Sequence, residues 1–198
     1  GPPAPAKAEV AYLIPWGAQA AGRFLTAALR ADLKVHSANK PFQHSGRNFT
    51  SGTLIVQIGQ NNATVHEKVA RIAAASGAEV VAANSSWVDG GIDFGSNHVT
   101  VIKKPAILLA WDSPTSSASA GQTRFVLERQ YGYPVTVART STLGMADLSR
   151  FQVLILPDSG LASYLPALGG PAADRIKAWV RSGGVLIGIG GALSYLSI

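Results

Sequence analysis

Short, continuous runs of apolar residues alternate with segments of helical periodicity along this 198-residue chain, and this alternation limits the possible folds more than any other feature. Uninterrupted apolar strands are typical of sheets that are covered on both faces, as in parallel α/β proteins. The repetition of strand and helix therefore predicts an α/β fold with mostly parallel open sheets and helices on both faces. The expected strands cover 10–14, 34–37, 53–58, 79–83, 106–111, 134–138, 153–156 and 185–189.

Helix signals separate several of these strands. Apolar residues recur at helical spacing over 18–31, which predicts an amphipathic helix there. Thr64 stands three residues before Glu67, the spacing of a capping box, in which two side chains satisfy each other's backbone amides at a helix start. Gly77 predicts the end of that helix, because glycine readily adopts the left-handed conformation found there.

Two further helices are expected in the second half of the chain. The first covers about 119–131 and should pack Phe125 and Val126 against a sheet. The second begins at Pro171, whose fixed φ and missing amide hydrogen suit the first helical turn, and it ends before the glycines 183–184. The expected core face of this second helix comprises Ile176, Trp179 and Val180.

Two segments depart from the alternation of strand and helix. A turn signal at 45–47 lies between two short aromatic-containing runs, so we expect 41–50 to form a β-hairpin. Segment 84–97 is rich in glycine, asparagine and aspartate, which predicts a long loop. Apolar residues that should hold this loop against the core are Trp87, Ile92 and Phe94.

These patterns divide the chain into three parts. Segment 1–8 is rich in proline and alanine and resembles a linker between domains, so we expect the chain to be a piece of a longer protein. Residues 9–102 should form an α/β segment with the hairpin as an insertion. Residues 103–198 should form a second α/β domain.

Composition excludes several classes of function. The net charge is +6, but the basic residues are scattered and not interleaved with aromatics, which argues against nucleic-acid binding. The chain has no cysteine, so disulfides, thiolate nucleophiles and thiolate metal ligands are excluded. No segment approaches the roughly 20 apolar residues that a membrane-spanning helix needs. We therefore expect neither a nucleic-acid partner nor a membrane span.

The histidines do not predict a metal site. None of them lies in the His-x-x-Glu or His-x-x-x-His spacing that places two ligands on one side of a metal. His66 and Glu67 are adjacent within a helical segment, so their side chains point about 100° apart. The four histidines are His36, His44, His66 and His98.

The glycine-rich turn after the last expected strand has the shape of a nucleophile elbow but carries no nucleophile. In such an elbow a sharp strand-to-helix turn lifts one side chain above the sheet, and here the residue at that position is Gly190. The turn also lacks Gly-x-Gly-x-x-Gly and the Walker Lys-Ser/Thr, so it does not predict a nucleotide site. Ser159 and Ser194 are the substitute nucleophiles to consider, although no motif places a histidine or an acid beside them.

Four segments of the second half carry a resemblance to a known fold, namely 105–111, 122–134, 151–158 and 176–190. They resemble the class I glutamine amidotransferase-like fold, which implies a flavodoxin-like arrangement over 103–198. The catalytic cysteine of that family would fall at Gly190, and its His-Glu pair would lie beyond Ile198, so this domain is expected to be degenerate, truncated or both.

The first half carries a resemblance in five places, namely 11–16, 41–56, 59–61, Trp87 and 95–97. These segments resemble the region that follows the catalytic domain in large bacterial proteins of the M14 zinc carboxypeptidase family. The resemblance implies a secreted or periplasmic parent protein that acts in proteolysis. Its zinc would belong to the catalytic domain, because the zinc ligands of that family have no matching positions here, so no cofactor is expected in this chain.

These observations favour a non-catalytic accessory region that binds a peptide or small ligand, or that positions the parent's catalytic domain. One alternative is an enzyme, either a serine hydrolase that uses Ser159 or Ser194 or a peptidase whose site is completed by sequence outside this chain. The other is a scaffold for oligomerisation. Ligands of open α/β sheets bind beyond the carboxyl ends of the strands, where the strand order reverses. The candidate surface there comprises Trp111, Asp112, Asp158, Ser159 and Gly190.

Overall fold

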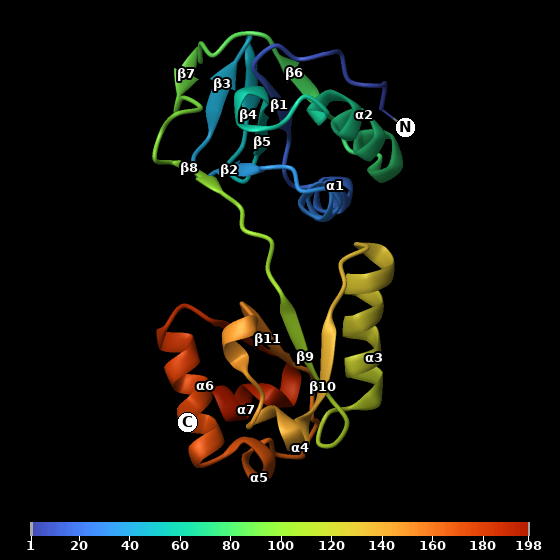
Figure 1. Ribbon diagram of the computed structural model, residues 1–198, viewed down its shortest axis with the longest axis vertical. Coiled ribbons are helices and arrows are strands. Elements are labelled where there is room, and N and C mark those ends of the chain that lie inside the picture. Colours follow the sequence, from blue (N-terminus) through green and yellow to red (C-terminus); the bar gives the residue numbers. More distant parts are fainter. Residues whose placement is uncertain (1, 198) are drawn as a thin grey trace. The chain divides into compact units, whose positions relative to one another are not determined.

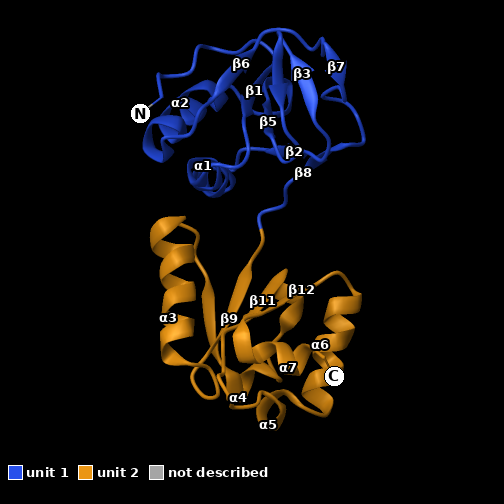
Figure 2. Ribbon diagram, turned by 180° about the vertical axis from the view of Figure 1, so that it is seen from behind, with its two compact units in different colours: residues 1–104 blue, residues 105–198 orange. Residues whose placement is uncertain are grey.

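The computed structural model describes residues 2–197, and the chain forms two units, residues 1–104 and 105–198 (Figure 2). Unit 1 contains a five-stranded sheet with strand order β6-β1-β5-β2-β8 and a three-stranded sheet with order β4-β3-β7. The strands of the large sheet are β1 (Ala11–Ile14), β2 (His36–Ala38), β5 (Leu54–Gln57), β6 (Val81–Ala83) and β8 (Val99–Val101). Those of the small sheet are β3 (Phe42–His44), β4 (Arg47–Phe49) and β7 (Gly90–Gly91).

The expectation of parallel strands is wrong for unit 1, because every strand pairing in its two sheets is antiparallel. The helices α1 (Gln19–Arg30) and α2 (Val65–Ser76) pack on one face of the large sheet, against Tyr12 and Ile14 of β1. The other face, with Leu13, packs against the small sheet. A continuous apolar run thus indicates that a strand is buried on both faces, and it does not indicate strand direction. In the large sheet of unit 1, helices cover one face only (Figure 1).

Local predictions in unit 1 had mixed outcomes. The hairpin at 41–50 is confirmed by the pairing of β3 with β4. The capping box is wrong: the Thr64 hydroxyl donates to Asn62 Oδ1 at 2.6 Å and makes no cap hydrogen bond to α2. Gly77 ends α2 with φ of +72°, as predicted. In the loop, Phe94 is buried, whereas the Trp87 side chain is exposed, so Trp87 does not hold the loop to the core. A short 3₁₀-helix, η1 (Ile58–Gln60), follows β5.

Unit 2 is built on a four-stranded parallel sheet with order β10-β9-β11-β12. On one face of the sheet, side chains that include Leu154 and Leu156 pack against helices and form the core of the unit. The other face carries α3 (Ser117–Phe125) with its π-helical extension η2 (Val126–Gln130) (Figure 1). The strands are β9 (Ile107–Trp111), β10 (Thr136–Arg139), β11 (Val153–Leu156) and β12 (Val185–Gly188). The other helical segments are α4 (Thr140–Leu143), η3 (Leu148–Arg150), α5 (Leu165–Leu168), α6 (Pro171–Arg181), η4 (Gly190–Ala192) and α7 (Leu193–Leu196).

The expected parallel sheet with helices on both faces is therefore found in unit 2. Pro171 begins α6, as predicted, and Ile176 and Trp179 are buried. Val180, Phe125 and Val126 were expected in the core but are exposed. Val180 lines a cavity beside Leu186 of β12, and Val126 lines a hollow beside Ile187 of the same strand. Among residues 2–197, no helix has the length and apolar character needed to cross a membrane.

Candidate functional site

The candidate residues lie where parallel strands of unit 2 end. Trp111 is the last residue of β9, Asp158 comes two residues after β11, and Gly190 comes two residues after β12. Because β10 and β11 flank β9 on opposite sides, the strand order reverses between β9 and β11. Ligand crevices of open α/β sheets form at this kind of switch point.

The Asp158 carboxylate is the centre of this edge. Its Oδ1 accepts hydrogen bonds from the backbone amides of Gly191, at 2.6 Å, and Gly160, at 2.8 Å. These amides, that of Gly191 first, lower the pKa of Asp158 below its ordinary value of 3.8. The side chain is therefore an anion that joins its own loop to the turn after β12.

The backbone of Asp158 is held to the start of α3. Its amide donates to Ser119 Oγ at 3.0 Å, and its carbonyl accepts from the Ser116 amide at 2.7 Å. Ser116 also caps α3, since its hydroxyl accepts from the Ser119 amide. Neither serine was identified as a candidate from the sequence. A signal was present in the polar loop that follows β9, because serine is a preferred residue at helix starts.

Gly190 adopts φ of +55°, which agrees with the sharp turn expected from the sequence. A Cβ atom at this position would lie 2.6 Å from Asp158 Oδ1 and 2.7 Å from its Cγ. Any side chain at residue 190 would therefore meet the carboxylate as well as an unfavourable backbone angle. The place where a nucleophile would project is occupied by Asp158.

Two amides that converge on one oxygen are the arrangement by which acyl-transfer enzymes stabilise an oxyanion. In α/β-hydrolases one donor is the amide of the residue after the nucleophile, which corresponds here to Gly191. The second donor comes from a neighbouring loop, as Gly160 does here. In this protein a carboxylate of the chain itself satisfies both donors, so a substrate oxygen would have to displace it.

Trp111 and Asp112 lie on the neighbouring loop and do not join this hydrogen-bond cluster. The Arg124 guanidinium lies 5.9 Å from the centre of the Trp111 ring, and the Trp111 carbonyl accepts from the Thr140 hydroxyl at 3.1 Å. Asp112 has φ of +71°, and its Oδ1 accepts from the Ser113 amide. These contacts shape the loop after β9 and leave the Asp112 side chain exposed.

The two candidate serines are not arranged as nucleophiles. The buried Ser159 hydroxyl donates to the Ala162 carbonyl at 2.8 Å, and the Ser194 hydroxyl donates to the Gly191 carbonyl at 2.8 Å. All histidines of the chain lie before residue 104, so unit 2 contains no imidazole that could serve as a general base.

The histidines of unit 1 make separate contacts. His44 Nε2 bonds the Ser85 carbonyl at 3.0 Å, and the Nδ1 atoms of His66 and His98 bond a tyrosine hydroxyl and an asparagine amide oxygen, each at 2.9 Å. His36 is buried, its Nδ1 has no hydrogen-bond partner among the described residues, and burial followed by the nearby Lys34 charge lowers its pKa. Within 2–197, no three histidine, cysteine or acidic side chains come together as a group that could hold a metal ion.

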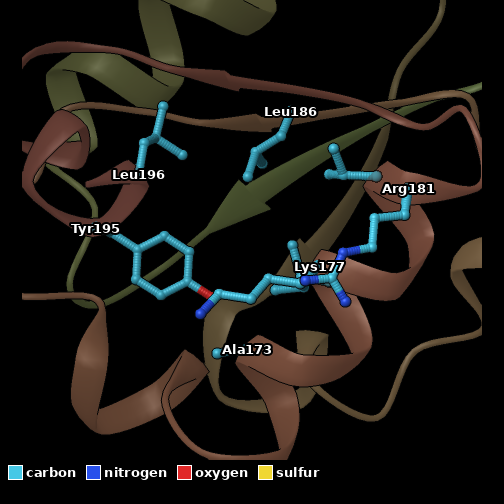
Figure 3. A pocket seen from close by; sticks show the side chains of 8 residues that line it. Ala173, Lys177, Arg181, Leu186, Tyr195 and Leu196 are labelled. Carbon is cyan, nitrogen blue, oxygen red and sulfur yellow. The ribbon is translucent and has the colours of Figure 1, made fainter. Parts of the chain in front are cut away.

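A cavity of about 250 Å³ lies elsewhere in unit 2, between α6, β12 and α7 (Figure 3). Lys177 and Arg181 lie along α6 at its wall, and Leu186 and Leu196 provide apolar surface. This cavity was not predicted from the sequence. The spacing of the two cations, four residues apart on one helix, places them on one face and was the available signal.

Comparisons with protein-family models, with curated proteins and with solved structures found no match for this chain.

Proposed function

We propose that this chain is a non-catalytic accessory region, and that the turn at Gly190 is a structural closure of unit 2 and not a reaction centre. The observation that carries the proposal is the Asp158 carboxylate, which accepts from both Gly160 and Gly191 and fills the space above Gly190. A site with neither a nucleophile nor a free oxyanion donor has no means of acyl transfer. The role left to unit 2 is to bind or to position another molecule.

The proposed context is a larger bacterial protein with a zinc carboxypeptidase domain, exported to the periplasm or secreted. The support for this context is the sequence resemblance of 11–16 and 41–56 to the region after the catalytic domain in the M14 family. On this proposal the parent's catalytic domain is the main partner and holds the zinc, while the accessory region binds a peptide or small ligand, or positions that domain.

We further propose that unit 2 has a flavodoxin-like fold of the class I glutamine amidotransferase-like type. Counted within the unit, its strand order is 2-1-3-4. This order coincides with the first four positions of the flavodoxin-like order 2-1-3-4-5. The turn at Gly190 then stands where that family has its catalytic cysteine, as the resemblance implies.

A serine-reactive fluorophosphonate tests the absence of catalysis. We expect intact-mass measurement to find no stoichiometric adduct on the purified chain, because both candidate hydroxyls donate to carbonyl oxygens and unit 2 has no histidine. The matched controls are Ser159→Ala and Ser194→Ala. An adduct that forms on the native chain and is lost in one of these variants would overturn the proposal.

The gene that encodes the chain tests the proposed context. We expect a domain with a His-x-x-Glu zinc motif before residue 1. A neighbouring sequence without such a domain would remove the peptidase context and would leave the argument on Asp158 intact.

A further inference from the structure

The two amides that bind the Asp158 carboxylate are held in place by the backbone around them. Gly160 and Gly190 have φ of +58° and +55°, in the left-handed region that glycine adopts readily. A Cβ atom at Gly191 would meet the Gly160 carbonyl oxygen, so the close approach of the two loops requires glycine there. The Asp158 amide is fixed by its hydrogen bond to Ser119 Oγ. The amides of Gly160 and Gly191 would therefore still converge if the Asp158 side chain moved away.

The Asp158 carboxylate is itself replaceable. Its Oδ1 accepts from Gly191 and Gly160, and within the described part of the chain no basic side chain forms an ion pair with it. The residues around it, Gly160 and Gly190, are exposed to solvent. A carboxylate of another molecule could take its place without leaving a buried charge unpaired, because the displaced side chain would enter water.

Converging backbone amides at the ends of such loops form concave anion sites, known as nests. Hydrogen bonds from amides to a carboxylate are stronger than those to a neutral oxygen. Nests of this kind are one recognised means of binding the C-terminal carboxylate of a peptide. In this structure the Asp158 carboxylate occupies the position that the carboxylate of a ligand would take.

The surroundings of the nest favour a ligand with an apolar group beside its carboxylate. Leu161 follows the donor Gly160 directly, and its side chain is fully exposed. The two donor loops, 159–163 and 189–193, contain no acidic residue, so Asp158 is the only negative charge that either loop places at the nest. The last residue of a peptide carries a carboxylate and a side chain on the same carbon atom, and it can therefore meet both features.

We propose that the amides of Gly160 and Gly191 form a binding site for the C-terminal carboxylate of a peptide that ends in an apolar residue, and that Asp158 closes this site until the peptide displaces it. The bound peptide is not converted, because residue 190 has no side chain to attack it. This inference rests on the proposed function and deepens it, since it names the ligand and the atoms that bind it.

Competition from Asp158 sets the expected affinities. When a site is open in only a fraction of the molecules, the apparent dissociation constant equals the intrinsic one divided by that fraction. If the carboxylate occupies the amides in at least about nine-tenths of the molecules, the native chain binds at least about tenfold more weakly than a chain without it. Asp158→Gly removes the competitor and should reveal the intrinsic affinity.

NMR titration of the intact chain, with the amides of Gly160 and Gly191 as reporters, tests the proposal. The probe is acetyl-Gly-Leu, and the matched control is its C-terminal amide. We expect saturable shifts of both amides in Asp158→Gly with a Kd of about 1–10 mM, binding at least about tenfold weaker in the native chain, and no such shifts with the amidated control.

Two further variants separate the nest from other effects. Asp147→Gly removes a carboxylate that accepts from a single backbone amide, that of Ser149, so it should bind the probe as the native chain does. Asp158→Asn keeps the shape of the side chain but replaces the charged acceptor by a neutral one. It should bind the probe more tightly than the native chain and more weakly than Asp158→Gly. If Asp158→Gly does not fold, the comparison of Asp158→Asn with the native chain decides the question.

Several results would overturn the proposal. Equal shifts with the acid and its amide, or no shift in Asp158→Gly up to about 100 mM, would exclude a carboxylate site. Equal affinity of Asp158→Gly and the native chain would show that Asp158 does not close the nest. Acetate that binds as tightly as acetyl-Gly-Leu would indicate a small free acid as the ligand, and equal binding of acetyl-Glu-amide would indicate a side-chain carboxylate. The fluorophosphonate result is independent of these outcomes, so the two proposals fail separately.

Discussion

Replacement of Gly190 by alanine tests whether the turn after β12 and the Asp158 carboxylate require each other. The new Cβ would stand 2.6 Å from Asp158 Oδ1, about 1 Å inside an ordinary contact distance of roughly 3.5 Å. It would also force a non-glycine residue to adopt φ of +55°. The left-handed backbone costs about 1–2 kcal/mol, and overpacking adds about 1–3 kcal/mol. We expect Gly190→Ala to destabilise unit 2 by about 2–5 kcal/mol.

The same change in an Asp158→Gly background separates the two causes. Without the carboxylate the steric cost of the new Cβ disappears, and only the cost of the left-handed backbone, about 1–2 kcal/mol, should remain. The double-mutant cycle should therefore show a coupling of at least about 1 kcal/mol between the two positions.

Urea-dependent hydrogen exchange, measured by mass spectrometry, is a suitable assay because it follows the amides of unit 2 separately from those of unit 1. Gly183→Ala is the matched control, since this glycine also has a positive φ, of +107°, but has no atom within 4 Å of an added Cβ. Its cost should be independent of residue 158. Equal destabilisation by Gly190→Ala in both backgrounds would refute the reasoning.

Three further predictions concern polar groups of the described structure. Tyr164→Phe should destabilise unit 2 by about 1–2 kcal/mol in urea unfolding, since it removes a buried 2.7 Å hydrogen bond to the Pro157 carbonyl; no change would contradict this. The pKa of His36 is lowered on folding, so this imidazole binds a proton more readily in the unfolded chain, and unit 1 should lose stability as the pH falls below about 6.5. His36→Gln should flatten this dependence of unfolding free energy on pH. The same pH dependence in the native chain and in the variant would refute the prediction. The pKa of Asp158 is also lowered on folding, so its contribution to the stability of unit 2 is present above about pH 3.8 and is lost as the pH falls further. Asp158→Asn should therefore reduce the acid sensitivity of unit 2, measured by urea unfolding between pH 2 and pH 5. An unchanged sensitivity would contradict the role of the carboxylate.

The sequence predicted elements well where local signals agree with the tertiary environment. The apolar run at 153–156 became β11 over the same residues, and the glycine at 190 marked a turn that requires a positive φ. The direction of the unit 1 strands could not be predicted in this way. A strand covered by helices on one face and by a small sheet on the other has the same continuous apolar pattern as a parallel strand between two helical layers.

Two other failures have physical reasons of a different kind. Thr64 has the spacing of a capping residue, but its hydroxyl donates to Asn62 Oδ1 and therefore does not cap α2. The function of Asp158 depends on an amide 33 residues away, at Gly191, and no local pattern reports such a contact. The five candidate residues do lie at or just after strand ends, while the contacts among them could be seen only in the fold. Their role as a ligand-binding surface stays a prediction.

The contacts of Asp158 also bear on whether a partner could provide this edge with acyl-transfer chemistry. An acyl-transfer enzyme leaves its oxyanion donors free to stabilise the transition state, and this costs folding stability. A chain that satisfies these donors with its own carboxylate gains stability but cannot use them to stabilise an oxyanion. A histidine supplied by another domain would bring a general base to the edge of unit 2. It would not free Gly160 and Gly191, and it would not provide residue 190 with a side chain. On the proposed function, acyl transfer by a nucleophile at residue 190 would therefore require changes at both residue 158 and residue 190, and a supplied base alone would not be sufficient.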